Sequence, residues 1–230
     1  MNHGSGVKKG EAELIFIRYE NWRSYLKYYP VTSLLLLANV VMFVIVSLNG
    51  GSTDLQTLVD YGALTDHPLY KGDLWRYFTS IFLHNGLQHL FFNSFALLVF
   101  APPLERLMGW WRYALLYLLG GIAGNILTMA DLERNMENFA TVSVGASGAI
   151  YAVYGAFLYI ALLQRNIMDV GSRKTLYSLL VMGVITSFAT PHVNWVAHLG
   201  GLAAGFLLYG LIIRLLPRRR KTPRNGRLIG

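Results

Sequence analysis

Two residues that could do chemistry in this chain are a serine and a histidine, each at the start of a long apolar segment. Ser147 stands among small residues in Gly145-Ala-Ser-Gly148 and opens one apolar run. His198 begins another run and is followed at once by Gly200 and Gly201. A serine hydroxyl is a weak nucleophile until a neighbouring base accepts its proton, and an imidazole is a base of suitable strength. The pair therefore indicates covalent catalysis by serine, provided that the two segments lie side by side. Gly148 and Gly155 on one segment and Gly201 and Gly205 on the other are expected to allow this close approach.

Two more polar residues share one face of a third apolar segment. His89 and Asn93 are four positions apart, which places them one helical turn from each other. Their N–H groups could join the backbone N–H of Ser147 in binding the oxyanion that forms when serine attacks a carbonyl. Tyr151 is related to Ser147 by the same spacing, and its ring could support the imidazole by stacking. Because no acidic residue lies within the segments that carry Ser147 and His198, the sequence predicts a dyad without a carboxylate.

Each of these features also has a plainer interpretation. A string of small residues in a membrane helix often serves only close packing, and an isolated intramembrane histidine can be a proton relay or a ligand. Four histidines could in principle bind zinc: His84, His89, His192 and His198. No His-Glu-x-x-His motif is present, however, and no acidic residue stands beside them. We therefore expect neither a metal ion nor any other cofactor.

The composition is that of a membrane protein. Of the 230 residues, 54% are hydrophobic and only 14% are charged, with a mean hydropathy of +0.40. These values exclude the water-soluble classes. The absence of cysteine excludes disulfides, thiolate zinc sites and a cysteine nucleophile. The net charge is +8, and the basic residues lie between and beyond the apolar runs. Membrane topology explains this distribution, so no nucleic-acid partner is expected.

The apolar runs predict an all-α polytopic membrane protein, a compact bundle of six transmembrane helices. We expect the spans at 31–48, 86–101, 110–130, 145–163, 176–189 and 194–216. The second is expected to stop at Pro102-Pro103, and the fifth is shorter than the roughly 20 residues that a spanning helix needs. The loop at 50–84 is too apolar to float freely, so short helices at the membrane interface are expected there. Asn39 and Asn125 are expected to make hydrogen bonds between helices.

The basic residues predict an orientation. If all six segments span, all but three of the 20 lysines and arginines lie on one side, the exceptions being Lys71, Arg76 and Arg134. The positive-inside rule then predicts a multi-pass protein of the cell membrane with both termini in the cytoplasm. The expected parts are a cytoplasmic tail and interfacial segment (1–30), the membrane domain (31–216) and a basic cytoplasmic tail (217–230). Ser147, His198 and His89 would each begin a span on the outer side, at similar depth.

Five motifs occur in an order that is more specific than any of them alone. They are Trp75-Arg76, His89-Leu-Phe-Phe-Asn93, Glu105-Arg106 followed by Gly109, Gly145-Ala-Ser147-Gly148 and Ala197-His198-Leu-Gly-Gly201. Together they resemble the rhomboid family of intramembrane serine proteases over nearly the whole stretch from 31 to 216. The resemblance implies that Ser147 is the nucleophile and His198 the general base. It also implies that His89 and Asn93 stabilise the oxyanion and that Tyr151 packs against His198.

The same resemblance implies an activity and its partners. We expect a minimal, six-helix, bacterial-type serine endopeptidase that cleaves transmembrane segments near the outer membrane–water boundary. Its partners would be single-span membrane proteins and the lipid bilayer, and its oligomeric state is left open. We expect a substrate to pass beside the fifth span, with a shift of the 190–194 turn. The alternative is a non-proteolytic relative, either chaperone-like or a transporter, although the presence of both Ser147 and His198 favours the enzyme.

Overall fold

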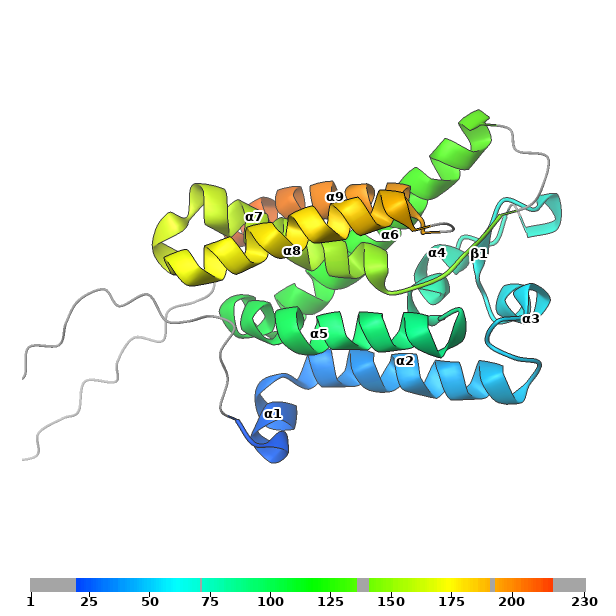
Figure 1. Ribbon diagram of the computed structural model, residues 1–230, viewed down its shortest axis with the longest axis horizontal. Coiled ribbons are helices and arrows are strands. Elements are labelled where there is room, and N and C mark those ends of the chain that lie inside the picture. Colours follow the sequence, from blue (N-terminus) through cyan, green and yellow to red (C-terminus); the bar gives the residue numbers. More distant parts are fainter. Residues whose placement is uncertain (1–19, 71, 136–140, 191–192, 217–230) are drawn as a thin grey trace, which may run out of the picture.

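The computed structural model describes residues 20–70, 72–135, 141–190 and 193–216 (Figure 1). The expected basic tail at 217–230 and the first 19 residues lie outside these ranges. Within them the elements are α1 (Trp22–Tyr28), α2 (Pro30–Leu48), α3 (Leu55–Asp60), β1 (Leu64–Thr65), η1 (Pro68–Tyr70), α4 (Arg76–Thr79), η2 (Ser80–Phe82), α5 (Gly86–Met108), α6 (Trp110–Asn135), β2 (Val142–Ser143), α7 (Ser147–Leu163), η3 (Arg165–Ile167), α8 (Val170–Ala189) and α9 (Trp195–Leu215).

The long helices pack side by side, and the short elements between α2 and α5 gather at one end together with β2 (Figure 1). Helices α5, α7 and α9 begin at that end and run in the same direction, whereas α2, α6 and α8 run towards it (Figure 1). Helix α7 contacts α5, α6, α8 and α9, and almost all of its residues from Gly148 to Ala161 are buried. A helix that is apolar all round is expected at such a central place. The residues that begin α5, α7 and α9 are therefore brought to one end of the molecule.

Four helices in the described ranges are long and apolar enough to cross a membrane: α2, α5, α6 and α9. Helix α7 is equally apolar but shorter, with 17 residues. Large apolar side chains such as Leu34, Phe91 and Leu207 point outward, as side chains in contact with lipid do. The chain is therefore an all-α, multi-pass membrane protein, apart from the two-residue antiparallel pairing of β1 with β2. That all six long helices span stays a prediction.

Several predicted helix borders are wrong. Helix α5 does not stop at Pro102-Pro103 but continues to Met108. Proline lacks the amide N–H and normally ends a helix. Here the residues on either side, including Phe100 and Leu104, are buried in the core, and in apolar surroundings a helix interrupted by proline is tolerated when neighbouring helices cover it. Tertiary packing thus outweighs a local signal.

Helices α6 and α8 are longer than predicted. Helix α6 runs past position 130 to Asn135, and α8 begins at Val170 rather than 176. The side chain of Asp169 accepts a hydrogen bond from the backbone N–H of Ser172 at 2.8 Å, which caps the first turn of α8. With 20 residues, α8 has the length of a spanning helix. The polar residues of its first turns lay outside the apolar run from which the fifth span was predicted.

The extension of α5 places a carboxylate at the start of α2. Glu105 is only 2% exposed, and its two oxygens accept hydrogen bonds from the backbone N–H groups of Val31 and Thr32 and from the Thr32 hydroxyl. The first N–H groups of a helix have no acceptor within the helix, and the helix dipole favours a negative charge there. Glu105 thus has a structural role, which is to accept the first N–H groups of α2.

Arg76 organises the segment between α2 and α5. Its guanidinium donates hydrogen bonds to the carbonyl oxygens of Val59 and Ala63 and pairs with Asp73 at 3.0 Å. It also lies over the rings of Tyr70 and Trp75, with its central carbon 4.3 and 4.6 Å from the centroids. The short helices expected in this segment are confirmed, and their place at the membrane interface stays a prediction.

The two asparagines singled out in the spans differ. The Asn125 amide donates hydrogen bonds to the carbonyl oxygen of Tyr77 and the hydroxyl of Ser80, so the expected link between helices is confirmed for this residue. Asn39 is completely buried in α2, but neither its Nδ2 nor its Oδ1 has a partner among the described residues. The predicted interhelical bond of Asn39 is therefore wrong, because packing places no suitable group within reach.

Candidate active site

Ser147 is the first residue of α7, and the backbone before it makes a sharp turn. Gly145 has a φ of +129°, a conformation that residues with a side chain rarely adopt. Its N–H donates a hydrogen bond to the carbonyl oxygen of Ser80 at 2.9 Å. Ser147 itself is half-buried, and the first N–H groups of a helix have no acceptor within the helix. The hydroxyl and these backbone donors therefore share one helix end.

The strand before this turn is held on two sides. On one side β2 pairs with β1, and the backbone N–H of Thr141 donates to the Asp66 carboxylate at 2.6 Å. On the other side the Asn194 amide donates to the hydroxyls of Ser143 and Thr128 at 2.9 and 3.0 Å. The Asn194 oxygen accepts the N–H of Ala197 and so caps α9. Asn194 thus ties the approach to Ser147 to the start of α9. Sequence reasoning missed this residue, although asparagine before an apolar run is an N-cap signal.

Helices α7 and α9 approach each other closely because glycines line their contact. A methyl group added at Gly201 would collide with the carbonyl oxygen of Gly148, and one added at Gly205 would collide with that of Ala152. The close approach expected from these glycines is confirmed. The first turns of α7 and α9, which carry Ser147 and His198, therefore lie together. Within the described residues the Ser147 hydroxyl makes no hydrogen bond, to His198 or to any other group.

The imidazole of His198 is held by two other helices. Its ring stacks on that of Tyr151 in α7, with centroids 4.2 Å apart and an angle of 8° between the planes. Its Nδ1 lies 2.6 Å from the hydroxyl oxygen of Ser187 in α8, which is also 3.0 Å from the Tyr151 hydroxyl. The ring contact has the geometry expected from sequence. Ser187 was not singled out there, although a polar residue inside an apolar segment is itself a signal.

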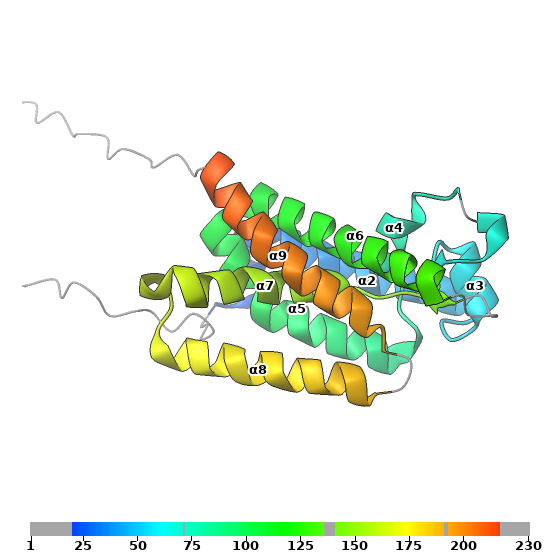
Figure 2. The ribbon, with the colours of Figure 1, turned by 90° about the horizontal axis from the view of Figure 1, so that it is seen from above.

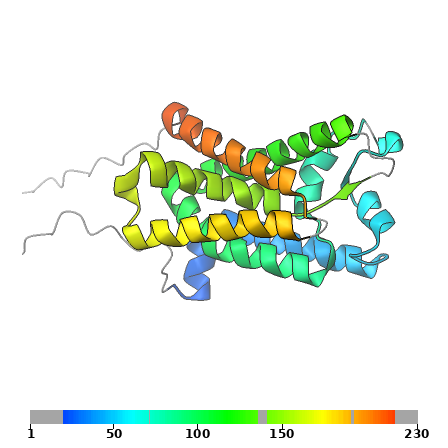
Figure 3. The same cartoon turned by 45° about the horizontal axis from the view of Figure 1, so that its top comes forward.

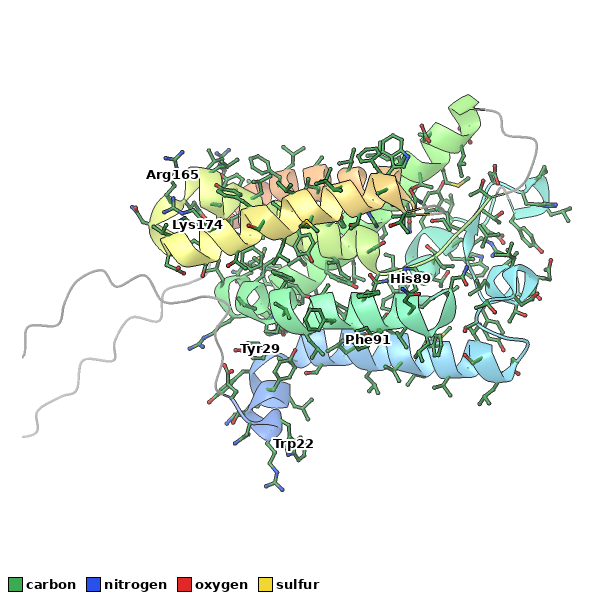
Figure 4. The ribbon with its side chains drawn as sticks, in the orientation of Figure 1. Trp22, Tyr29, His89, Phe91, Arg165 and Lys174 are labelled. Carbon is green, nitrogen blue, oxygen red and sulfur yellow. The ribbon has the colours of Figure 1, made fainter. Side chains whose placement is uncertain are left out.

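His89 and Asn93 lie beside the turn that leads to Ser147. A methyl group built on Gly145 would be 2.7 Å from Cε1 and Nε2 of His89 and 3.6 Å from Nδ2 of Asn93. The backbone N–H of Asn85 donates to Nδ1 of His89 at 3.3 Å, which leaves the ring proton on Nε2. Nδ2 of Asn93 is buried and has no partner among the described residues. Two side-chain N–H donors are thus available here, and Figure 4 labels His89 at this end of α5.

A second imidazole stands next to His89. His84 is almost completely buried, and its ring meets that of His89 edge to face at 5.1 Å. Burial, and to a lesser degree the neighbouring His89, lowers the pKa of His84 to about 3, so this ring is uncharged at neutral pH. In the described part of the chain no three metal-ligating side chains gather, and His192 lies outside it. Independence from metal stays a prediction.

The fold and this cluster define a multi-pass helical membrane protein with a serine, two histidines and an asparagine gathered where three helices begin. The family model of the Rhomboid domain matches residues 71–215, which include all of these side chains. The chain therefore belongs to the rhomboid family.

Individual relatives agree with this assignment. A Bacillus subtilis (strain 168) protein named "Putative rhomboid protease YdcA" is 37% identical over 207 residues, which are 89% of this chain and 100% of that protein. Rhomboid protease GluP of the same organism is 35% identical over 76% of this chain, but the match covers 33% of its own length. RHOMBOID-like protein 1 of Arabidopsis thaliana is 34% identical over 74% of this chain and 43% of its own length. The chain thus spans the whole of one relative and less than half of the other two.

Proposed function

We propose that this protein is an intramembrane serine endopeptidase with Ser147 as nucleophile and His198 as general base. The observation that carries the proposal is the gathering of the His198 ring and two N–H donors, from His89 and Asn93, around the first turn of α7. Two Bacillus subtilis relatives are named as rhomboid proteases, which supports the same reaction class.

In the proposed reaction, the Ser147 hydroxyl oxygen attacks a substrate carbonyl while Nε2 of His198 takes its proton. The tetrahedral oxyanion accepts hydrogen bonds from the backbone N–H of Ser147, the Nε2–H of His89 and the Nδ2–H of Asn93. His198 then returns the proton to the leaving amine, so that the peptide bond breaks and an ester on Ser147 remains. Water, deprotonated by His198, hydrolyses that ester and restores the hydroxyl.

We further propose that all six long helices cross the cell membrane with both termini in the cytoplasm. The ends of α5, α7 and α9 that carry the site would then face the outer surface, within reach of water. Arg165 and Lys174 lie at the opposite end of the molecule from His89 (Figure 4), and basic residues favour the cytoplasmic side. This arrangement would place the reaction at the outer membrane–water boundary.

A substrate for this site would be a transmembrane segment of another protein, which must be locally unwound. A helix hides its carbonyl groups in its own hydrogen bonds, and each unpaired backbone group in hydrocarbon costs several kcal/mol. A wet site near the surface relieves that cost. Helix α8 lies at the edge of the helix group and packs against α7 and α9 (Figures 2 and 3). The proposed access route for a single-span substrate therefore runs beside α8.

The test is cleavage of a single-span reporter by purified protein in detergent. Wild-type protein is expected to cut it, and both Ser147→Ala and His198→Ala to abolish cutting while the protein stays folded. A serine-directed fluorophosphonate should label Ser147, and a chelator should leave the rate unchanged. Full activity of Ser147→Ala would refute the nucleophile assignment, and a rate lost to chelator and restored by zinc would move the histidines into a metal site. No cleavage by the wild type would favour the non-proteolytic alternative.

A further inference from the structure

One hydroxyl group on α8 has three hydrogen-bonding partners. The Ser187 oxygen lies 2.7 Å from the carbonyl oxygen of Gly183, 3.0 Å from the hydroxyl of Tyr151 and 2.6 Å from Nδ1 of His198. Ser187 is only 4% exposed and His198 only 8%, so water does not compete freely for these bonds. Three helices therefore meet at a single oxygen atom.

The protons of this cluster can be assigned by counting donors and acceptors. A serine hydroxyl donates one hydrogen bond and accepts two. The carbonyl oxygen of Gly183 can only accept, so the Ser187 proton goes to it, in the bond to the preceding turn that serine commonly makes within helices. Tyr151 and His198 must then both donate to the Ser187 oxygen. His198 accordingly carries its proton on Nδ1, and the lone pair of Nε2 is free.

The two contacts of the imidazole restrain different motions. Stacking on Tyr151 holds the plane of the ring, because the two planes are within 8° of parallel. Stacking does not stop the ring from turning within that plane. The hydrogen bond from Nδ1 to Ser187 prevents this in-plane rotation, because it points one ring nitrogen at a fixed atom.

We propose that Ser187 is a positioning residue that holds His198 as the Nδ1–H tautomer, with Nε2 turned towards the reacting serine. The inference rests on the proposed function only in giving His198 the role of base. A neutral hydroxyl on α8 then does the orienting that the buried carboxylate does in a Ser-His-Asp triad. The dyad predicted from the sequence therefore has a third member, supplied by another helix.

The position of Ser187 makes the imidazole sensitive to α8. Gly183 lets the two helices approach, since a methyl group there would lie 2.7 Å from the Tyr151 hydroxyl oxygen. The stack with Tyr151 joins α7 to α9 and does not involve α8. A sideways displacement of α8 would therefore remove the acceptor of Nδ1–H and leave the stack in place, so the helix proposed to admit substrate also governs the tautomer of the base.

The experiment compares Ser187→Ala and Ser187→Thr with Thr186→Ala. Thr186 is a matched control, because its hydroxyl also donates to the preceding turn of α8 but is exposed and, among the described residues, makes no hydrogen bond to Tyr151 or His198. We expect Ser187→Ala to lower kcat roughly 10- to 100-fold with little change in KM, which is the effect of one lost hydrogen bond to a group that becomes charged. Ser187→Thr, which keeps the hydroxyl, should recover most of the rate, and Thr186→Ala should match the wild type.

A second readout is independent of cleavage. In protein labelled with ¹⁵N in its imidazoles, nuclear magnetic resonance distinguishes the two tautomers, and the His198 signals are those missing from His198→Gln. We expect Nδ1–H in the wild type and a shift towards Nε2–H in Ser187→Ala. An Nε2–H wild type, or a kcat and tautomer unchanged in Ser187→Ala, would overturn the proposal. Failure of the proposed function would show instead as absent cleavage by the wild type, whatever the tautomer.

Discussion

At the scale of single residues, the buried Nδ2 of Asn93 has no partner among the described residues. An unsatisfied buried donor costs about 1–3 kcal/mol, and native proteins contain few of them. Nδ2 of Asn93 lies beside the Gly145 turn, where the proposed oxyanion forms. A donor that meets its acceptor only in the transition state lowers the barrier without binding the substrate more tightly. An unpaired N–H donor beside this turn is what the proposed oxyanion role requires.

We predict that Asn93→Ala lowers kcat roughly 100- to 1000-fold and leaves the melting temperature almost unchanged. His89→Ala should act in the same direction, and some activity should remain because the Ser147 backbone N–H is still present. Ser94→Ala is the matched control, since its hydroxyl is also buried without a partner among the described residues, one position further along α5. Steady-state kinetics measures kcat, and thermal unfolding measures the melting temperature of each variant. Normal turnover with a lowered melting temperature would give Asn93 a structural role only.

At the scale of elements, the contact between α7 and α9 depends on some of its glycines more than on others. The methyl group of an alanine at position 201 would meet the carbonyl oxygen of Gly148, which is backbone and cannot turn away. An alanine at position 148 would meet atoms of Ala197, the nearest being its carbonyl oxygen at the ordinary contact distance of 3.5 Å. Exchange of glycine for alanine within a helix is otherwise favourable, by roughly 1 kcal/mol.

We therefore predict opposite outcomes for two equivalent substitutions. Gly201→Ala should lower the free energy of unfolding by about 1–3 kcal/mol, the usual cost of overpacking, whereas Gly148→Ala should leave it unchanged or slightly raised. Unfolding in detergent, followed by circular dichroism, measures both. Equal stability of the two variants would mean that the helices are not held as closely as the structure places them.

At the scale of the whole molecule, the prediction concerns the route of the substrate. If substrate passes between α8 and α5, a disulfide that joins these helices should stop cleavage of a membrane-embedded reporter, and reduction should restore it. The chain contains no cysteine, so an introduced pair would be the only thiols present. A pair that joins α6 to α9, which pack together, serves as the control. Equal cleavage by the oxidised and reduced forms of the α5–α8 pair would exclude this route.

The substrate side of the same prediction follows from the cost of unwinding. Replacing a glycine just after the cleavage point of the reporter by leucine stabilises the helix by roughly 1 kcal/mol, which corresponds to a rate about fivefold lower. The rate of reporter cleavage in vesicles measures this effect. A rate that does not respond to helix-weakening residues would mean that unwinding does not limit cleavage.

The sequence by itself indicated which residues could do chemistry, and it determined the all-α membrane class and the glycines that bring α7 and α9 together. These follow from residue type, hydropathy and helical spacing, which are local properties of the chain. Local properties were misleading where packing decides the outcome. Helix α5 continues through Pro102-Pro103 because its neighbours bury it, and Asn39 lacks the expected partner because no suitable group of the described residues lies within reach.

Only the tertiary structure decided which groups touch the imidazole and the turn before the serine. Ser187 precedes His198 by 11 residues and lies on a separate helix, and no spacing rule relates positions on separate helices. The approach of Gly145 to His89 likewise depends on how α5 packs beside the strand that leads to α7. Contacts of this kind are set by the angles and distances between helices, and those arise from the packing of all their side chains at once. For this reason the sequence indicated a dyad, whereas the folded chain adds a third group from α8.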